Sequence, residues 1–275
     1  MRRPGPSPAG IAGADGGLGA LLDLAVRAAQ AGGREIRARA GRVTGVGVKS
    51  TPTDPVTDTD RAAERAIVDV LIATRPDDGI VGEEGTARPG STGLHWVIDP
   101  LDGTVNHLYG LPHTTVSVAC EARESLADGS TAPWALVGAV HDPARGETFR
   151  AARGVGAWLG GELLRRRDVT DLGTALVATG FSYAATSRAR QARVLAHLLP
   201  RVRDLRSHGS AALELCWVAA GRCDAYYEDE LAPWDWAAGA LIAAEAGAAV
   251  TPLGSGVLAC PPGLATALAD LLTTG

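Results

Sequence analysis

Residues 95–107, HWVIDPLDGTVNH, join an apolar run to two aspartates three positions apart. The Trp-Val-Ile run at 96–98 carries no charge and predicts a buried strand. Asp99 precedes Pro100, which favours extended backbone at the aspartate, and Asp102-Gly103 is a frequent turn pair. The stretch therefore predicts a strand that ends in two carboxylates and a turn. A turn accounts for one carboxylate, and the second raises the question of a chemical role.

The rest of the chain mixes helical and strand periodicities without a repeat or a long linker. Helical patterns predict helices over 18–39, 56–76, 187–200, 210–222, 233–250 and the end of 256–272. Strand patterns cover 43–50, 79–85, 94–100, 114–122, 134–143, 146–154, 154–164, 175–182, 223–229 and the start of 256–272. This mixture predicts a layered α+β or α/β sandwich.

The length of 275 residues allows one large domain or two small ones. We expect two packed halves, 18–150 and 151–275, that meet near residue 150. The first half carries most of the candidate metal ligands, and the second carries the substrate side and Asp235. Residues 1–17 are rich in Gly, Pro and Ala and predict a flexible N-terminal segment.

The net charge and the composition indicate which kinds of partner and which cellular compartment to expect. The net charge of −5 argues against nonspecific nucleic-acid binding. No apolar stretch reaches the roughly 18 residues that cross a bilayer, so no membrane partner is expected. The cysteines form no CxxC pair and, in a chain without a recognisable signal peptide, indicate reduced thiols. We therefore expect a cytoplasmic protein.

Acidic residues recur at the ends of predicted elements, at Asp60, Glu83-Glu84, Asp99, Asp102 and Asp235. Each has a plain structural explanation when taken alone, as a helix-dipole partner, a solvated loop, a turn or a cap. Together they lie where mixed folds place active-site residues. Clustered carboxylates repel one another unless a cation balances them, and Mg²⁺ prefers such oxygen ligands. No His or Cys joins them, which points away from zinc.

The spacing in DPLDGT, residues 99–104, suggests how a site could form. If the turn folds back, Asp99, the carbonyl of Leu101 and Asp102 can face one cavity. Thr104 then supplies a hydroxyl that could hold a water near a metal, and such a water can attack phosphorus. Lys49 is the single lysine of a chain with 25 arginines. It is either present by chance or part of a site that needs a compact ammonium group.

The motifs resemble those of the inositol monophosphatase family. WVIDPLDGTVNHLYGLP is similar to its first signature, W-x-[IV]-D-P-[IL]-D-G-T-x-N-[FY], and PWDWAAG to its second, W-D-x-A-[AG]. DPVTDTDRAAE, VGEEG and GSAALELCWVAAGRCDAYYE match further blocks in the family's order. The resemblance runs from about residue 18 to the C-terminus.

The resemblance implies a metal site and a catalytic pair. It implies that two or three Mg²⁺ ions are held by Glu83, Asp99, Asp102, Asp235 and the carbonyl of Leu101. Thr104 and Asp60 would orient and activate the attacking water, and Glu83 would act with them beside a weaker third metal site. Lys49 matches a lysine that lies near the metal site in the family. Glu84 would contact the metal ligands without binding a metal itself.

On the substrate side, the resemblance implies contacts from Asp102, Gly103, Thr104, Gly209, Ser210, Ala211 and Glu228. Glu228 would accept hydrogen bonds from sugar or cyclitol hydroxyls. Two departures from the family pattern bear on the leaving group. His107 stands where Phe or Tyr usually follows the asparagine, and Ser207-His208 stands where many bacterial members have another basic residue.

The family's fold is an αβαβα layered sandwich, commonly a homodimer, dependent on Mg²⁺ and sensitive to lithium. The expected activity is hydrolysis of inositol 1-phosphate, a small phosphate substrate. Histidinol-phosphate phosphatase and a fructose-1,6-bisphosphatase-like activity remain alternatives of the same class. A binding or regulatory protein that has kept the fold is the alternative from another class, which the full carboxylate set disfavours.

Overall fold

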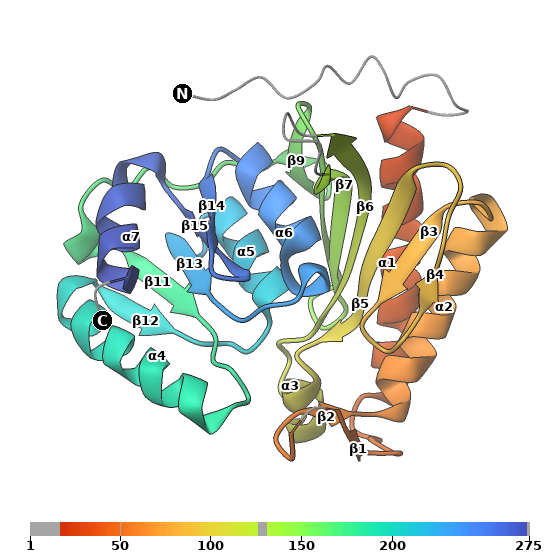
Figure 1. Ribbon diagram of the computed structural model, residues 1–275, viewed down its shortest axis with the longest axis horizontal. Coiled ribbons are helices and arrows are strands. Elements are labelled where there is room, and N and C mark those ends of the chain that lie inside the picture. Colours follow the sequence, from red (N-terminus) through yellow and green to blue (C-terminus); the bar gives the residue numbers. More distant parts are fainter. Residues whose placement is uncertain (1–16, 50, 126–130, 274–275) are drawn as a thin grey trace.

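The computed structural model describes residues 17–49, 51–125 and 131–273, and within these it has five layers (Figure 1). Helices α1 and α2 cover one face of a large sheet, and α5 and α6 lie between that sheet and a smaller one. Helices α4 and α7 cover the outer face of the smaller sheet. This order confirms the αβαβα sandwich. Except for Gly17, the predicted flexible segment 1–17 lies outside the described residues.

The helices follow the predicted apolar periodicities closely. Their bounds are α1 Leu18–Arg39, α2 Asp58–Thr74, α3 Thr104–Tyr109, α4 Ala185–Leu198, α5 Ala211–Ala219, α6 Pro233–Glu245 and α7 Ala265–Thr273. Thr57 is the N-cap of α2, and Pro233 occupies the first turn of α6, where its missing N–H costs nothing. α3 is one short helix that the sequence pattern did not predict.

The large sheet has the strand order β10-β9-β8-β7-β6-β5-β3-β4. Its strands are β3 Gly79–Gly82, β4 Ala87–Arg88, β5 Leu94–Asp102, β6 Thr115–Ser125, β7 Thr131–Asp142, β8 Glu147–Ala152, β9 Gly156–Leu159 and β10 Glu162–Leu163. β3 and β5 are parallel, and the other neighbours are antiparallel. The strands predicted over 134–143 and 146–154 correspond to the antiparallel pair β7–β8.

The small sheet has the order β12-β11-β13-β15-β14. Its strands are β11 Leu176–Thr179, β12 Asp204–Arg206, β13 Ala225–Glu228, β14 Ala249–Leu253 and β15 Gly256–Cys260, and the pair β1 Gly47–Val48 and β2 Pro55–Val56 stands apart. The predicted division near residue 150 falls inside β8. The chain passes from one sheet to the other only after Leu163 and before Leu176.

One boundary was predicted wrongly, and it lies in the opening stretch. The strand predicted over 94–100 includes Asp99 but stops before Asp102, whereas β5 runs through both of them. Asp99 pairs with Ser117 and Asp102 with Thr115, so β5 advances three positions while β6 advances two. One extra residue therefore makes a β-bulge. Pro100 fits there, because it has no N–H to give to the sheet.

Glycine lets α6 lie close to the large sheet. A Cβ on Gly138 of β7 would meet the backbone of Ala238 in α6, at 2.9 Å from Cα and 3.1 Å from the carbonyl oxygen. On the other side of the helix, a Cβ on Gly239 would meet Leu215 of α5 at 2.8 Å. Among the residues described, every helix is too short or too polar to span a bilayer.

We expect Gly138→Ala to lower the free energy of unfolding by about 1–3 kcal/mol, because the added methyl group must push α6 away from the sheet. The measurement is the shift in the urea midpoint of the full chain. Gly161→Ala is the matched control, since a Cβ there meets nothing within 4 Å. Equal midpoints for the two variants would contradict close packing at Gly138.

Candidate metal centre and active site

A cavity of 570 Å³ opens beside the β-bulge of β5 and is lined from both halves of the chain. The lining includes β5, α3 and the residue after β3 on one side and β13, α6 and the segments after β11 and β12 on the other. It brings together the sequence-predicted residues Lys49, Glu83, Asp99, Leu101, Asp102, Gly103, Thr104, Gly209, Ala211, Glu228 and Asp235. Asp60, Glu84 and Ser210 are not among the lining residues but contact those that are.

The β-bulge is fixed by its own hydrogen bonds. Asp99 is 1% exposed, and its Oδ1 accepts the N–H of Leu101 at 2.9 Å. Gly103 follows with φ +100°, and a Cβ there would lie 2.6 Å from the carbonyl oxygen of His113. Only glycine adopts this left-handed backbone readily. α3 starts immediately afterwards, so Thr104 is held at the helix start beside Leu101.

Thr104 is hydrogen-bonded to Asp60, far away in sequence. Its Oγ1 donates to Asp60 Oδ1 at 2.8 Å and approaches the Leu101 carbonyl oxygen at 3.2 Å. Asp60 Oδ2 in turn accepts the N–H and the hydroxyl of Thr57, at 2.8 and 2.5 Å. This is the capping box of α2. Asp60 therefore has both a structural partner and one in the cavity.

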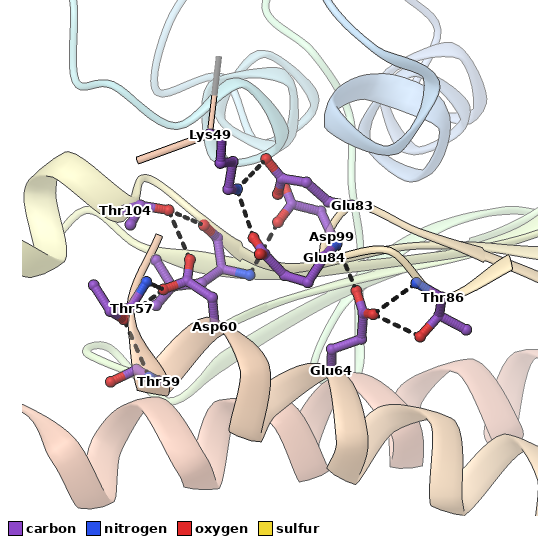
Figure 2. Close-up of polar contacts among 11 residues, drawn as sticks. Lys49, Thr57, Thr59, Asp60, Glu64, Glu83, Glu84, Thr86, Asp99 and Thr104 are labelled. Atoms are coloured by element: carbon purple, nitrogen blue, oxygen red, sulfur yellow. Dashed lines mark hydrogen bonds and ion pairs between the residues drawn. The ribbon is translucent and has the colours of Figure 1, made fainter. Parts of the chain in front are cut away.

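Glu83 and Glu84 follow β3, and Glu64 of α2 holds their turn (Figure 2). Glu64 Oε2 accepts the N–H of Glu84 at 2.8 Å, and its Oε1 accepts the N–H and hydroxyl of Thr86 at 3.1 and 2.6 Å. Gly82 leaves room for this carboxylate, since a Cβ there would meet Oε2 at 2.5 Å. Sequence reasoning missed Glu64, whose only signal was an acid on the buried face of a helix.

Lys49 joins the two glutamates from the opposite side. Its Nζ lies 2.8 Å from Glu83 and 2.5 Å from Glu84, as Figure 2 shows. Although burial lowers the pKa of Lys49, the two carboxylates raise it well above its usual value. Burial raises the pKa of Glu84 to about 7 against the opposing effect of Lys49. The single lysine of the chain therefore contributes positive charge beside the acidic cavity.

The start of α5 fixes Asp102. Asp102 Oδ2 accepts the Ser210 hydroxyl at 2.8 Å and the N–H of Ala212 at 2.7 Å. Asn106 ties the same segment to α3, because its Nδ2 donates to the carbonyl oxygens of His208 and Gly209 at 2.6 and 3.3 Å. The prediction for Ser210 is a substrate contact through the backbone around it, and its side chain donates to Asp102. Asn106 was not predicted.

Asp235 and Glu228 come from α6 and β13. Asp235 lies in the first turn of α6, where its Oδ2 accepts the N–H of Ala232 at 2.7 Å. The Ser117 hydroxyl of β6 donates to the carbonyl oxygen of Trp234 at 3.1 Å and fixes this turn on the large sheet. Glu228 Oε2 accepts the Tyr226 hydroxyl at 2.6 Å.

The carboxylate cluster, defined as Glu83, Asp99, Asp102 and Asp235, carries strongly perturbed acids. Burial raises the pKa of Asp102 to about 7. Burial, with repulsion from Asp102 and Glu83, raises that of Asp235 to about 8. Burial and then repulsion from Glu83 raise the pKa of Asp99 well above its usual value. The cluster therefore needs protons or cations to balance its charge.

The donor set fits hard divalent cations, because it consists of carboxylate and carbonyl oxygens without His or Cys. In the described residues, no three acidic, His or Cys side chains are yet arranged as ligands of one ion. The carboxylate of Glu83 forms an ion pair with Lys49 in this structure. The cluster, with the carbonyl of Leu101, could hold metal ions in this cavity.

Of the residues that depart from the family pattern, His107 and His208 lie outside the cavity lining. His107 is buried against Thr59 of α2, with Nε2 3.0 Å from its hydroxyl. Nδ1 of His208 lies 2.8 Å from the buried carboxylate of Glu214. His107 thus packs α3 on α2 and His208 packs its segment on α5, while Ser207 does line the cavity.

The five layers and the acidic cavity define a sugar-phosphatase fold of the αβαβα class. The family model described as the inositol monophosphatase family matches residues 18–270. The inositol-1-monophosphatase of Mycobacterium leprae is 48% identical over 259 residues, which are 88% of this chain and 85% of that protein. The chain therefore belongs to the inositol monophosphatase family, a family of phosphatases.

Two further relatives show the range of names within this likeness. The crystal structure of the extragenic suppressor protein suhB from Bartonella henselae superposes with a TM-score of 0.84 at 32% identity, over 93% of this chain and 99% of that one. The Nus factor SuhB of Pasteurella multocida is 41% identical over 240 residues, 86% of each protein.

We expect the metal-free protein to lose stability as the pH rises from 3.8, the ordinary pKa of an aspartate, to about 8. The raised pKa values of Asp102 and Asp235 mean that the folded state binds more protons than the unfolded state in this window. The free energy of unfolding therefore falls with increasing pH. The measurement is the thermal unfolding midpoint in chelator across the window.

Asp235→Asn removes one of these groups and should make the fall with pH shallower. Asp168→Asn is the control, because the Asp168 side chain is 83% exposed. If Asp235→Asn and wild type lost stability in parallel, charge in the cluster would not be the cause.

Proposed function

We propose that the chain is a Mg²⁺-dependent phosphomonoesterase that hydrolyses inositol 1-phosphate to inositol and phosphate. The observation that carries this proposal is the Thr104–Asp60 hydrogen bond at the edge of the carboxylate cluster. It joins a hydroxyl that can orient a water to a carboxylate that can take a proton. The relatives named inositol-1-monophosphatase support the same substrate.

In this proposal Glu83, Asp99 and the carbonyl of Leu101 would hold one Mg²⁺, and Asp99, Asp102 and Asp235 would hold another. A third ion would border Glu83. When bound, the ions supply charge that polarises the phosphoryl group and lowers the pKa of a water. The structural ties described above, from Glu64 to Glu84 and from Ser210 and Ala212 to Asp102, keep these ligands in place.

Thr104 and Asp60 act on the nucleophile. Because Thr104 donates its own proton to Asp60 Oδ1, the Thr104 oxygen keeps lone pairs that can accept a hydrogen bond from water. Asp60 is held rigidly by Thr57 and serves as the final proton acceptor. Lys49 balances Glu83 and Glu84 and so limits the repulsion between acid groups near the attacking water.

The substrate would lie across the cavity from the cluster to β13. The backbone of Gly103, of 209–211 and of the start of α5 offers N–H groups to the phosphate, with the helix dipole in the favourable direction. Glu228 at the end of β13 would bind the hydroxyls of the leaving inositol. Homodimer formation, lithium sensitivity and a cytoplasmic location are carried over from the resemblance as parts of this proposal.

We expect Asp102→Asn and Asp235→Asn each to lower kcat/KM for inositol 1-phosphate by at least about 100-fold, since each removes a proposed metal ligand. Both variants should keep a cooperative unfolding transition, because the amide preserves the side-chain shape. The measurement is Mg²⁺-dependent phosphate release, with Asp168→Asn as control. Wild-type turnover in either variant would refute the proposed site. Absence of hydrolysis by the wild type itself, across sugar, polyol and nucleotide phosphates, would favour the binding-protein alternative.

We expect Glu64→Gln to raise the Mg²⁺ concentration needed for half-maximal activity by roughly three- to tenfold. The amide keeps one acceptor oxygen but turns an NH₂ group toward backbone N–H donors, which loosens the turn that carries Glu83. Glu162→Gln, at an exposed position of β10, is the matched control. An unchanged Mg²⁺ requirement in Glu64→Gln would show that Glu64 does not position Glu83.

A further inference from the structure

The charges that line the cavity are unevenly distributed. Within the described part of the chain, seven acidic side chains line it, at Asp54, Glu83, Asp99, Asp102, Glu228, Glu230 and Asp235. The same part contributes one cationic lining residue, Lys49, which is paired with Glu83 and Glu84 at the metal end. Two lining carboxylates at and just after the end of β13, Glu228 and Glu230, form what we call the acidic rim.

Glu230 is held in an unfavourable backbone conformation. Its φ of +60° is the one positive value at a non-glycine residue in the ranges 17–49, 51–125 and 131–273. Side chains with a Cβ avoid this region, so surrounding contacts must impose it. The Ser187 hydroxyl and Arg190 Nη2 of α4 supply such contacts, at 2.8 and 2.9 Å from Glu230 Oε1.

The neighbouring charges leave the rim negative. Arg190 is shared, because its Nη2 also lies 2.5 Å from Asp229, so one cation faces two carboxylates. Hydrogen bonds from Ser187 and Ser182 hold the pKa of Glu230 below its usual value, and its side chain remains 41% exposed. Glu230 is thus a fixed negative charge at the cavity mouth.

Glu228 has little freedom to move away from the rim. A Cβ on Gly180 would lie 1.9 Å from Glu228 Oε2, so the segment after β11 closes directly over this carboxylate. Gln191 of α4 fixes both walls of the mouth. Its Oε1 accepts the N–H of Ser182 at 3.1 Å, and its Nε2 donates to Asp229 at 2.9 Å.

We propose that Glu230 is a specificity-determining residue that restricts the site to phosphate monoesters whose leaving group is uncharged or cationic. This rests on the proposed function, which places the phosphate at the carboxylate cluster and the leaving group at the rim. A second phosphate on the substrate would carry −1.5 to −2 charges at neutral pH. It would meet the ionised carboxylate of Glu230 there, with Arg190 already engaged.

The test compares three substrates in the presence of Mg²⁺. They are inositol 1-phosphate with an uncharged leaving group, fructose 1,6-bisphosphate with an anionic one and histidinol phosphate with a cationic one. Glu230→Gln removes the charge and keeps the shape, and Glu230→Gly removes the charge and relieves the backbone. Glu162→Gln on exposed β10 controls for loss of an acid elsewhere.

We expect both Glu230 variants to raise the ratio of kcat/KM for the bisphosphate over that for inositol 1-phosphate by roughly three- to tenfold. The corresponding ratio for histidinol phosphate should fall by a similar factor. Both changes should shrink as salt is added, because the rim is solvent-exposed. Glu162→Gln should leave all ratios unchanged.

Three results would overturn the inference while leaving the proposed function intact. One is hydrolysis by both variants with unaltered charge preference. Another is a change in Glu230→Gly alone, which would assign the effect to backbone conformation. The third is a change in preference that persists at high salt. Failure of the proposed function gives a different result, since the wild-type protein would then release no phosphate from inositol 1-phosphate.

Discussion

The repulsion between buried carboxylates is the constraint around which this molecule is arranged. Asp99 is almost fully buried, and three further acids of the cluster raise its pKa. Such a group is stable only if a proton or a cation is close by. Lys49 balances part of the negative charge in the cavity. In the proposed function, metal ions would balance the rest. The same metal ions would then both neutralise the buried carboxylates and take part in catalysis.

Holding these acids together requires rigid supports from distant parts of the chain. The β-bulge of β5 turns Asp99 and Asp102 into the cavity, and the start of α5 fixes Asp102. The capping box of α2 holds Asp60, and Glu64 one turn later holds the Glu83 segment. α2 therefore carries two anchors for one site, which explains why its first turns are buried although they are polar.

Much of this could be predicted from the sequence, and the failures have physical causes. Helix α1, which has a clear apolar stripe, begins and ends at the predicted residues. The three-residue β12 and the six-residue α3 have patterns too short to detect. The β-bulge was not predicted, because it depends on how β5 pairs with β6, and the sequence of β5 alone does not determine that register. Glu64 escaped because its partners are backbone N–H groups brought near only by folding.

The metal end and the leaving-group end treat the same kind of charge differently. At the carboxylate cluster, burial raises the pKa values of Asp99, Asp102 and Asp235, and in the proposed function metal ions would balance their charge. At the rim, Glu230 is exposed and stays ionised through hydrogen bonds from α4. The cluster is anchored by β5, α2, α5 and α6, whereas α4 holds the rim. Because separate elements carry the two ends, a substitution on α4 or the rim can change substrate preference without moving a metal ligand. Under the proposed function, relatives with this fold could then share the chemistry of the cluster and differ in the residues of the rim.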